Sequence, residues 1–369
     1  MLTKHKAFFL WTLALSVPAV AQDDESAYDK LWGKVIWYEN AENDILQKLA
    51  FTGRLQGDYY HFDDETAGSF SDFGWRRFRV GFKASLFKEI TVHSEADLDL
   101  NNPEPLYNKL TDTYLSWTTE GGVKFKVGKQ SAPFTLGGST SSKKLYTLER
   151  GKIASNIWFS KEYFSGLTFS GQKNKWEYLA GIYSSDHGPE FDEAFDYGCF
   201  GLFSLGYNFK ENLELNNALV RVAYVKQQDD VLSQTPAHKN VTSLVAKLDK
   251  GKTHLWVDLS FSDGYGGQSD LFGLQIMPFY DITDKTQAVF SYSHLRSAGD
   301  DDLKLNKYEK SLSGNTGKEV SEYFLGLNHF FYGHKLKWQA ALQYTEMEDV
   351  AAVSQYDGWG FTSGIRISW

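Results

Sequence analysis

The chain has 369 residues, enough for two soluble domains on length alone, and a formal net charge of −9. Its one cysteine, Cys199, excludes an intramolecular disulfide framework, and no apolar run beyond the N-terminus approaches ~18 residues, which excludes a transmembrane helix there. Aromatic residues make up 16% of the chain, yet its mean hydropathy is polar at −0.42. Strands that have one face in lipid and the other in a water-filled lumen combine many aromatic residues with a polar mean hydropathy in this way.

Residues 1–21 have the three parts of a secretory signal peptide. Residues 4–6 form a basic start, residues 7–17 an apolar run, and residues 19–21 a small-x-small cleavage site before Gln22. A membrane anchor is the rival interpretation, but the run is too short to cross ~30 Å of hydrocarbon. Loss of the peptide and its two lysines leaves about 348 residues with a net charge of about −11.

Residues 22–45 begin with three acidic side chains and predict a small periplasmic extension, with a short hairpin around residues 31–39. Residues 46–369 read as strand-like segments of about ten residues, separated by clusters of Gly, Asn, Asp and Ser. The sixteen predicted strands are 46–60, 74–87, 89–100, 107–119, 123–130, 163–172, 176–184, 200–209, 217–226, 241–250, 253–262, 271–281, 287–296, 321–331, 335–346 and 359–369. An even number puts both termini on the periplasmic side of a barrel.

Several segments alternate cleanly between apolar and polar residues. In the first, Phe51, Leu55 and Tyr59 share one face, while Arg54 and Gln56 share the other. This period of two is the signal of a strand, and it also fits a soluble sheet that is half-packed on a core, such as a large β-sandwich. The persistence of both faces over sixteen segments, with almost no helix between them, favours a sixteen-stranded antiparallel transmembrane β-barrel.

The last strand carries the sharpest local signal. Phe361, Ile365, Ile367 and Trp369 lie on one parity, and Arg366 points the other way. A terminal aromatic residue in an alternating strand resembles the assembly signal of outer-membrane barrels, so we expect the chain to engage the barrel assembly machinery through Trp369. A soluble protein that happens to end in a strand is the alternative.

Short turns alternate with long polar segments. Residues 87–89 and 120–122 are tight turns. The predicted long loops are 61–73, 131–162, 185–199, 227–240, 297–320 and 347–358. Long loops at one end and short turns at the other are expected of outer-membrane barrels.

Motifs for enzyme chemistry are not apparent. The sequence has no P-loop and no nucleophile elbow, and the nine histidines lack metal-ligand spacing. Residues 141–144 match the Ser-x-x-Lys pattern, but the helix and companion motifs of penicillin-binding enzymes are missing. We therefore expect no enzyme activity, no cofactor, no metal and no nucleic-acid partner.

Basic residues recur on the polar parity of the strands. A charge on the lipid face costs a few kcal/mol at the bilayer midplane, so these side chains must face the lumen or lie at the rim. They are Arg54, Arg77, Arg79, Lys83, Lys124, Lys126, Arg221 and Arg366. Inward cations can line an anion-selective path. The opposing interpretation is ordinary lumen charge, balanced by Asp58, Asp112 and Asp258.

The region from Gly53 to Arg150 resembles the phosphate-selective porin O and P family. The matching stretches keep the family's order and spacing. They are Gly53-Arg-Leu-Gln56, Arg76-Arg77 at the opening of the second strand, Asp112-Thr-Tyr114, Lys126-Val-Gly-Lys129, Pro133-Phe134, Thr140-Ser-Ser-Lys143 and Leu148-Glu-Arg150. The remainder of the chain matches only in strand pattern.

The resemblance implies a sixteen-stranded homotrimeric porin whose third loop, here residues 131–162, folds inward and constricts the pore. It also implies a central anion site made of an Arg pair, an Asp, two Ser and a loop Arg. By position these are Arg76, Arg77, Asp112, Ser141, Ser142 and Arg150. Guanidinium groups offer bidentate donors to phosphate, and a carboxylate can accept the proton that hydrogen phosphate still carries.

Three positions depart from the family pattern. Arg79 and Ser131 stand where aromatic residues are usual, and Gly138 stands where the loop usually has a Lys. These differences affect the size and charge of the expected constriction. The sequence therefore predicts a passive pore in the outer membrane for phosphate or related small anions. The alternatives are a pore for general solutes or sugars, and a barrel that acts as an adhesin or receptor.

Overall fold

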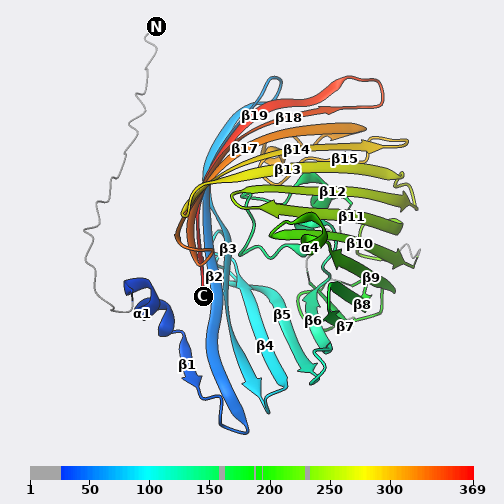
Figure 1. The fold of residues 1–369 in the computed structure, drawn as a ribbon. Helices are drawn as coiled ribbons and strands as arrows, with labels where there is room; N and C mark the ends of the chain where they lie inside the picture. The colour runs from blue at the N-terminus through cyan, green and yellow to red at the C-terminus, as the bar shows by residue number, and fades with distance from the viewer. Residues whose placement is uncertain (1–25, 158–162, 187, 193, 229–232) are drawn as a thin grey trace.

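The computed structural model describes residues 26–157, 163–186, 188–192, 194–228 and 233–369, and the predicted signal peptide lies outside them. Within these ranges sixteen antiparallel strands close into one barrel, in which each strand pairs with its neighbours in chain order (Figure 1). The last strand, β19 (Ser354–Ser368), pairs with the first barrel strand, β2 (Leu46–Asp64), and closes the ring. The predicted all-β antiparallel barrel is confirmed.

Every predicted strand is present, and most boundaries agree within three residues. The strands between β2 and β19 are β3 (Gly68–Leu86), β4 (Ile90–Leu98), β5 (Tyr107–Thr118), β6 (Lys124–Ser131), β7 (Tyr163–Lys173), β8 (Trp176–Ser184), β9 (Cys199–Asn208), β10 (Asn217–Gln227), β11 (His238–Lys250), β12 (Thr253–Gly264), β13 (Leu271–Thr283), β14 (Thr286–Ser297), β17 (Glu319–Tyr332) and β18 (Leu336–Glu348).

Two predicted loops are wrong. The first hairpin, β2 to β3, turns within residues 65–67, so most of the predicted loop 61–73 is strand. Similarly, β18 and β19 leave only residues 349–353 between them, in place of the predicted loop 347–358. Polar residues such as Asp63 and Ser71 continue the ladder past the membrane, where both faces of a strand meet water and the alternation of apolar residues ends.

The outer surface of the barrel is apolar and its inner face is polar. Along β17, Tyr323 and Leu325 are exposed, while Glu322 and Asn328 are buried. This arrangement is the reverse of a soluble sheet, because the exposed side chains are those that prefer hydrocarbon. The apolar parity therefore faces lipid, and the polar parity faces the lumen.

Aromatic rings line both ends of the outer surface. At the end with the short turns, contacting rings run through Trp117, Phe125, Phe169 and Tyr178. At the opposite end, contacting rings run through Tyr292, Tyr323, Tyr344 and Trp359. Amphipathic rings prefer the two membrane interfaces, so these rows mark the boundaries of the hydrocarbon layer.

The N-terminal extension covers an edge of the barrel. The predicted hairpin around residues 31–39 is wrong: the chain forms helix α1 (Ala27–Gly33) and then strand β1 (Ile36–Glu39), which pairs with β2. Because β19 pairs only with the part of β2 from Arg54 onward, residues 48–50 would otherwise keep a bare edge. Pairing with β1 satisfies that edge.

The loops carry the remaining elements. They are helices α2 (Leu136–Ser139), α3 (Lys152–Asn156) and α4 (Lys210–Leu213), the 3-10 turn η1 (Glu309–Ser311), and the small pair β15 (Leu303–Lys304) and β16 (Thr316–Gly317). None of the helices in the described part of the chain has the length and apolarity needed to cross a membrane.

Candidate functional site

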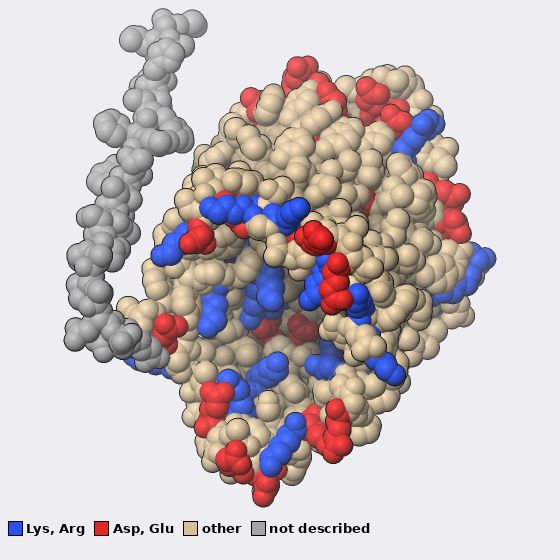
Figure 2. Space-filling view, viewed as in Figure 1, with Lys and Arg blue, Asp and Glu red and all other residues tan. Residues whose placement is uncertain are grey.

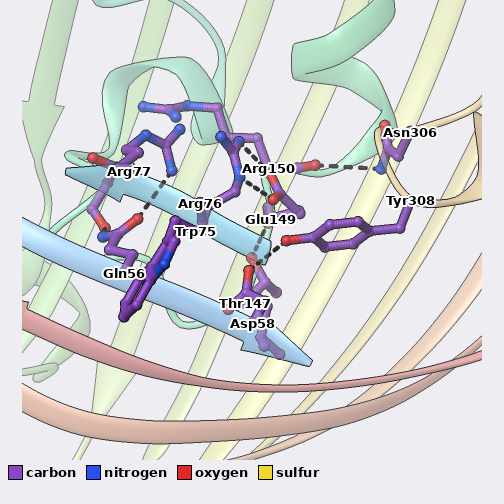
Figure 3. Close-up of polar contacts among 12 residues, drawn as sticks. Gln56, Asp58, Trp75, Arg76, Arg77, Thr147, Glu149, Arg150, Asn306 and Tyr308 are labelled. Atoms are coloured by element: carbon purple, nitrogen blue, oxygen red, sulfur yellow. Dashed lines mark hydrogen bonds and ion pairs between the residues drawn. The ribbon is translucent and has the colours of Figure 1, made fainter. Parts of the chain in front are cut away.

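A β-bulge in β3 turns two adjacent arginines toward the lumen. Gln56 of β2 pairs with Arg77, but the next residue, Gly57, pairs with Trp75, so Arg76 is an extra residue in the ladder. Strict alternation would send one of two neighbouring side chains into lipid. A bulge lets both point to the same side, and Figure 3 shows Arg76 and Arg77 together while Trp75 points elsewhere.

Arg76 forms a two-point ion pair with Glu149 from the loop between β6 and β7. Its Nε contacts Glu149 Oε1, and its Nη2 donates to Oε2 at 2.6 Å. Burial raises the pKa of the Glu149 carboxyl, but Arg76, Arg77 and Lys307 outweigh that effect and lower the pKa to about 2. Glu149 is therefore ionised at any physiological pH.

Arg77 belongs to a polar network that reaches Ser142. Arg77 Nη1 donates to Gln56 Oε1 at 3.1 Å, and Gln56 Nε2 donates to the Ser142 carbonyl at 3.2 Å. Arg54 donates to the Ser142 hydroxyl and, through Nη2, to Glu95 at 2.7 Å. Arg77 and Ser142, one of the two predicted serines, are therefore connected through Gln56.

Residues 132–157 make hydrogen bonds with inward-facing groups on many strands. These bonds join Leu136 N to Asp258 of β12, Ser139 Oγ to Arg221 of β10, the Tyr146 carbonyl to Asn328 of β17, the Leu145 carbonyl to Lys337 of β18, and the Leu148 carbonyl to Arg366 of β19. Within the same segment, Arg150 Nε donates to the Gly137 carbonyl at 3.0 Å and Nη2 to the Thr140 carbonyl at 3.2 Å.

The remaining predicted site residues are divided between two places. Ser141 is exposed, and its hydroxyl accepts a long bond of 3.4 Å from the Lys143 amide. Asp112 of β5 lies in the electrostatic environment of Glu95, Arg54 and Lys126. The predicted set therefore forms one group around Arg76, Arg77 and Arg150, and another around Ser142 and Asp112 that is joined to the first through Gln56.

Arg79 is tied to the wall of the barrel. Its Nε donates to Asp97 at 3.0 Å, and its Nη1 donates to the Tyr163 hydroxyl at 2.6 Å. Arg79 therefore adds an ion pair between β3 and β4. The predicted pore-lining lysines lie elsewhere on the wall, where Lys83, Lys124 and Lys126 interact electrostatically with one another.

Sequence reasoning missed a second loop that meets the site. In the segment after β14, Tyr308 stacks on Tyr60 with centroids 4.1 Å apart, and its hydroxyl donates to Asp58 at 2.5 Å. Burial lowers the pKa of the neighbouring Lys307, and Arg76 adds to this effect. The contact between Tyr308 and Asp58 spans 250 residues of sequence, and no local motif signals such a pairing.

The charges in the interior are mixed. Figure 2 shows Lys and Arg side chains gathered around and inside a hollow on the face turned to the viewer, with Asp and Glu among them. No cluster of three or more His, Cys, Asp or Glu among the described residues could hold a metal ion. The chemistry that this arrangement offers is the reversible binding of an ion by guanidinium, hydroxyl and amide donors.

Comparisons with known proteins agree with this architecture. Residues 49–198 match the family model described as "Phosphate-selective porin O and P". No curated protein matches the chain in sequence.

Among solved structures, the anion-selective porin of Comamonas acidovorans is similar, with a TM-score of 0.62, 11% identity, and coverage of 87% of this chain and 99% of that one. OmpT of Vibrio cholerae has a TM-score of 0.58 and 14% identity, with coverage of 89% and 99%. OprB of Pseudomonas putida has a TM-score of 0.60 and 12% identity, with coverage of 87% and 94%. The fold is that of outer-membrane porins, and residues 49–198 are similar in sequence to the phosphate-selective porin O and P family.

Proposed function

We propose that this outer-membrane porin passes small oxyanions, phosphate among them, by passive diffusion, and that residues 131–162 form its constriction. The supporting observation is the bulge that presents Arg76 and Arg77 side by side, next to Arg150 of the loop (Figure 3). Guanidinium forks match phosphate oxygens in geometry and charge. Ser141, Ser142 and Asp112 are proposed to complete the path with neutral donors and with one acceptor for the proton of hydrogen phosphate.

The proposal extends to the other expectations from the sequence. The chain is exported by a signal peptide at residues 1–21, which is cleaved before Gln22, and it is inserted by the barrel assembly machinery. It assembles as a homotrimer, as one solved form of the Vibrio cholerae OmpT does. Intact mass of the mature protein and its mass in detergent test these two points.

The test of anion passage is the reversal potential of the purified protein in a planar bilayer under a chloride gradient, with and without phosphate. We expect an anion-selective current that phosphate blocks. Replacing Arg77 and Arg150 together by Ala removes two lumen cations, and we expect the anion-to-cation permeability ratio to fall about ten-fold while the barrel stays folded.

The matched control is Arg296→Ala, because Arg296 lies at the end of β14 with a largely exposed side chain paired with Glu319. That variant should behave like the wild type. Unchanged selectivity in the Arg77 and Arg150 double variant would remove both residues from the ion path.

A weakly selective general pore is the second candidate. The observation in its favour is that lumen arginines have carboxylate partners: Arg54 with Glu95, Arg79 with Asp97, and Arg366 with Asp58. Paired charges cancel at a distance and leave little net field to exclude cations. A stable wild-type current with a reversal potential near zero, unaffected by phosphate, would favour this candidate over the anion pore.

A further inference from the structure

The Arg76–Glu149 pair joins a strand to a loop, in contrast to three other arginine–carboxylate pairs of the lumen. Arg54–Glu95, Arg79–Asp97 and Arg366–Asp58 each join two strands of the barrel. Glu149, by contrast, belongs to the loop between β6 and β7. The three pairs within the wall are largely buried, whereas both side chains of the Arg76–Glu149 pair are partly exposed, so the carboxylate of Glu149 can leave Arg76 by rotation of its own side chain.

Glu149 occupies the positions that a bound oxyanion would take on Arg76. Its two oxygens face Nε and Nη2, which are the parallel donors that a phosphate would engage. About one fifth of each side chain remains exposed, so a diffusing ion can approach the pair. The low pKa of Glu149 keeps its charge in place under physiological conditions.

The backbone around Glu149 is anchored, so release of the carboxylate requires no loop movement. Arg366 donates to the Leu148 carbonyl at 3.3 Å, and Asn306 donates to the Arg150 carbonyl at 3.5 Å. Beside Glu149 lies a cavity whose lining includes Arg150, Gln275 and Asn306, which can donate hydrogen bonds to a displaced carboxylate, together with the carboxylate of Glu322. The side chain therefore has somewhere to go while the main chain stays fixed.

We propose that Glu149 is an internal competitor that determines how tightly the pore holds its anion: a passing oxyanion displaces the Glu149 carboxylate from Arg76, and the carboxylate returns as the ion departs. This inference rests on the proposed anion pore and adds the residue that determines its affinity. Conduction needs a site that binds its ion and also releases it. A tethered carboxylate meets both needs, because the arginine never has to lose one charged partner before it gains another.

The test is phosphate block of the chloride current in planar bilayers, measured for the full-length mature protein and for Glu149→Gln. The glutamine keeps the size and one acceptor but loses the charge, so phosphate should bind Arg76 with less competition. We expect half-block at a phosphate concentration lower by about ten-fold or more, together with longer blocked events.

The matched control is Asp97→Asn, which also removes one carboxylate from an arginine of β3 but lies in the wall. It should change the reversal potential as any loss of negative charge does, without tighter phosphate block. Glu149→Asp, which keeps the charge on a shorter side chain, should give intermediate block and guards against a folding defect in the first variant.

Equal block in the wild type and Glu149→Gln, or equal tightening in Glu149→Gln and Asp97→Asn, would overturn the internal-competitor role. A wild-type pore that is not anion-selective would instead overturn the proposed function itself. The two failures are therefore distinguishable in one set of recordings.

Discussion

Lys143 is a loop cation that lies against the barrel wall. Its Nζ donates to the Trp369 carbonyl at 3.0 Å. Burial lowers the pKa of this amine to about 8; Arg54 and Arg79 act in the same direction, and Glu95 and Asp112 oppose them. The side chain is therefore charged below pH 8 and neutral above it.

The anion selectivity of the pore should therefore depend on pH. As pH rises from 7 to 9, we expect the anion-to-cation permeability ratio of the wild type to fall by about two-fold, because one lumen cation is lost. Lys143→Met should start at the lower ratio and show a flatter pH profile. Lys144→Met, in which the exposed neighbour is changed, should keep the wild-type profile; an identical decline in Lys143→Met would assign the effect to other groups.

At the scale of residues, the sequence predicted which side chains face the lumen better than it predicted which side chains contact one another. The period of two placed Arg54, Gln56 and Arg77 on the lumen side, where the structure has them buried. It could not show that Arg76 also turns inward, because the bulge depends on the register between β2 and β3. Nor could it pair Arg76 with Glu149, since the two are 73 residues apart and meet only once the barrel is closed.

At the scale of elements, a buried cluster joins the two large loops to the wall. Lys152 of α3 contacts Glu309 of η1 and lies 3.3 Å from Glu322 of β17, and all three are buried. Gln343 donates to Glu309 at 2.9 Å. Burial raises the pKa of Glu309, but Lys152 outweighs it and lowers the pKa, so the carboxylate is ionised in the folded loop.

Lys152→Met should release both loops. It leaves two buried carboxylates without their cation, a change that costs about 3–5 kcal/mol. We expect faster cleavage within residues 298–318 and 132–157 under limited proteolysis, with the barrel itself still resistant. Adding Glu309→Gln and Glu322→Gln removes the uncompensated charge and should restore much of the protection; wild-type cleavage rates in the single variant would rule out this anchoring role.

The strands themselves were predictable because membrane and lumen impose opposite demands on alternate residues. Alternation is no longer required beyond the membrane surface, so the pattern predicts that β2 ends at residue 60 and that β3 begins at residue 74. In the structure β2 continues to Asp64 and β3 begins at Gly68. The same reason explains the missed ends of β18 and β19. Helix α1 was missed because the predicted hairpin around residues 31–39 includes the last residues of this short helix.

At the scale of the whole molecule, Trp369 sits at the seam between the first and last strands. Its backbone N donates to the Gly53 carbonyl at 3.2 Å, and its ring stacks on Phe51 with centroids 5.9 Å apart. A methyl group at Gly53 would lie 2.5 Å from the indole and 2.4 Å from the Arg79 carbonyl, so only glycine fits beneath the ring. Trp369 is thus part of barrel closure.

Deleting Trp369 should lower the yield of heat-modifiable, membrane-inserted protein several-fold, because the seam loses two backbone hydrogen bonds and the stacked ring. Trp37→Ala is the comparison, since Trp37 also stacks on Phe51, is 63% exposed and takes no part in the β19 ladder. We expect near-normal folded yield from Trp37→Ala. Normal yield after loss of Trp369 would contradict the prediction that this residue is an assembly signal.

The bulge at Arg76 also bears on how such a pore can change over evolution. Without that residue, Trp75 would be followed by Arg77 and Phe78, and β3 would alternate regularly from end to end. One inserted codon therefore adds a cation to the channel while every lipid-facing side chain keeps its orientation. Selectivity can in this way be altered by insertion at a tolerant point of the ladder, independently of the hydrophobic pattern on which membrane insertion depends.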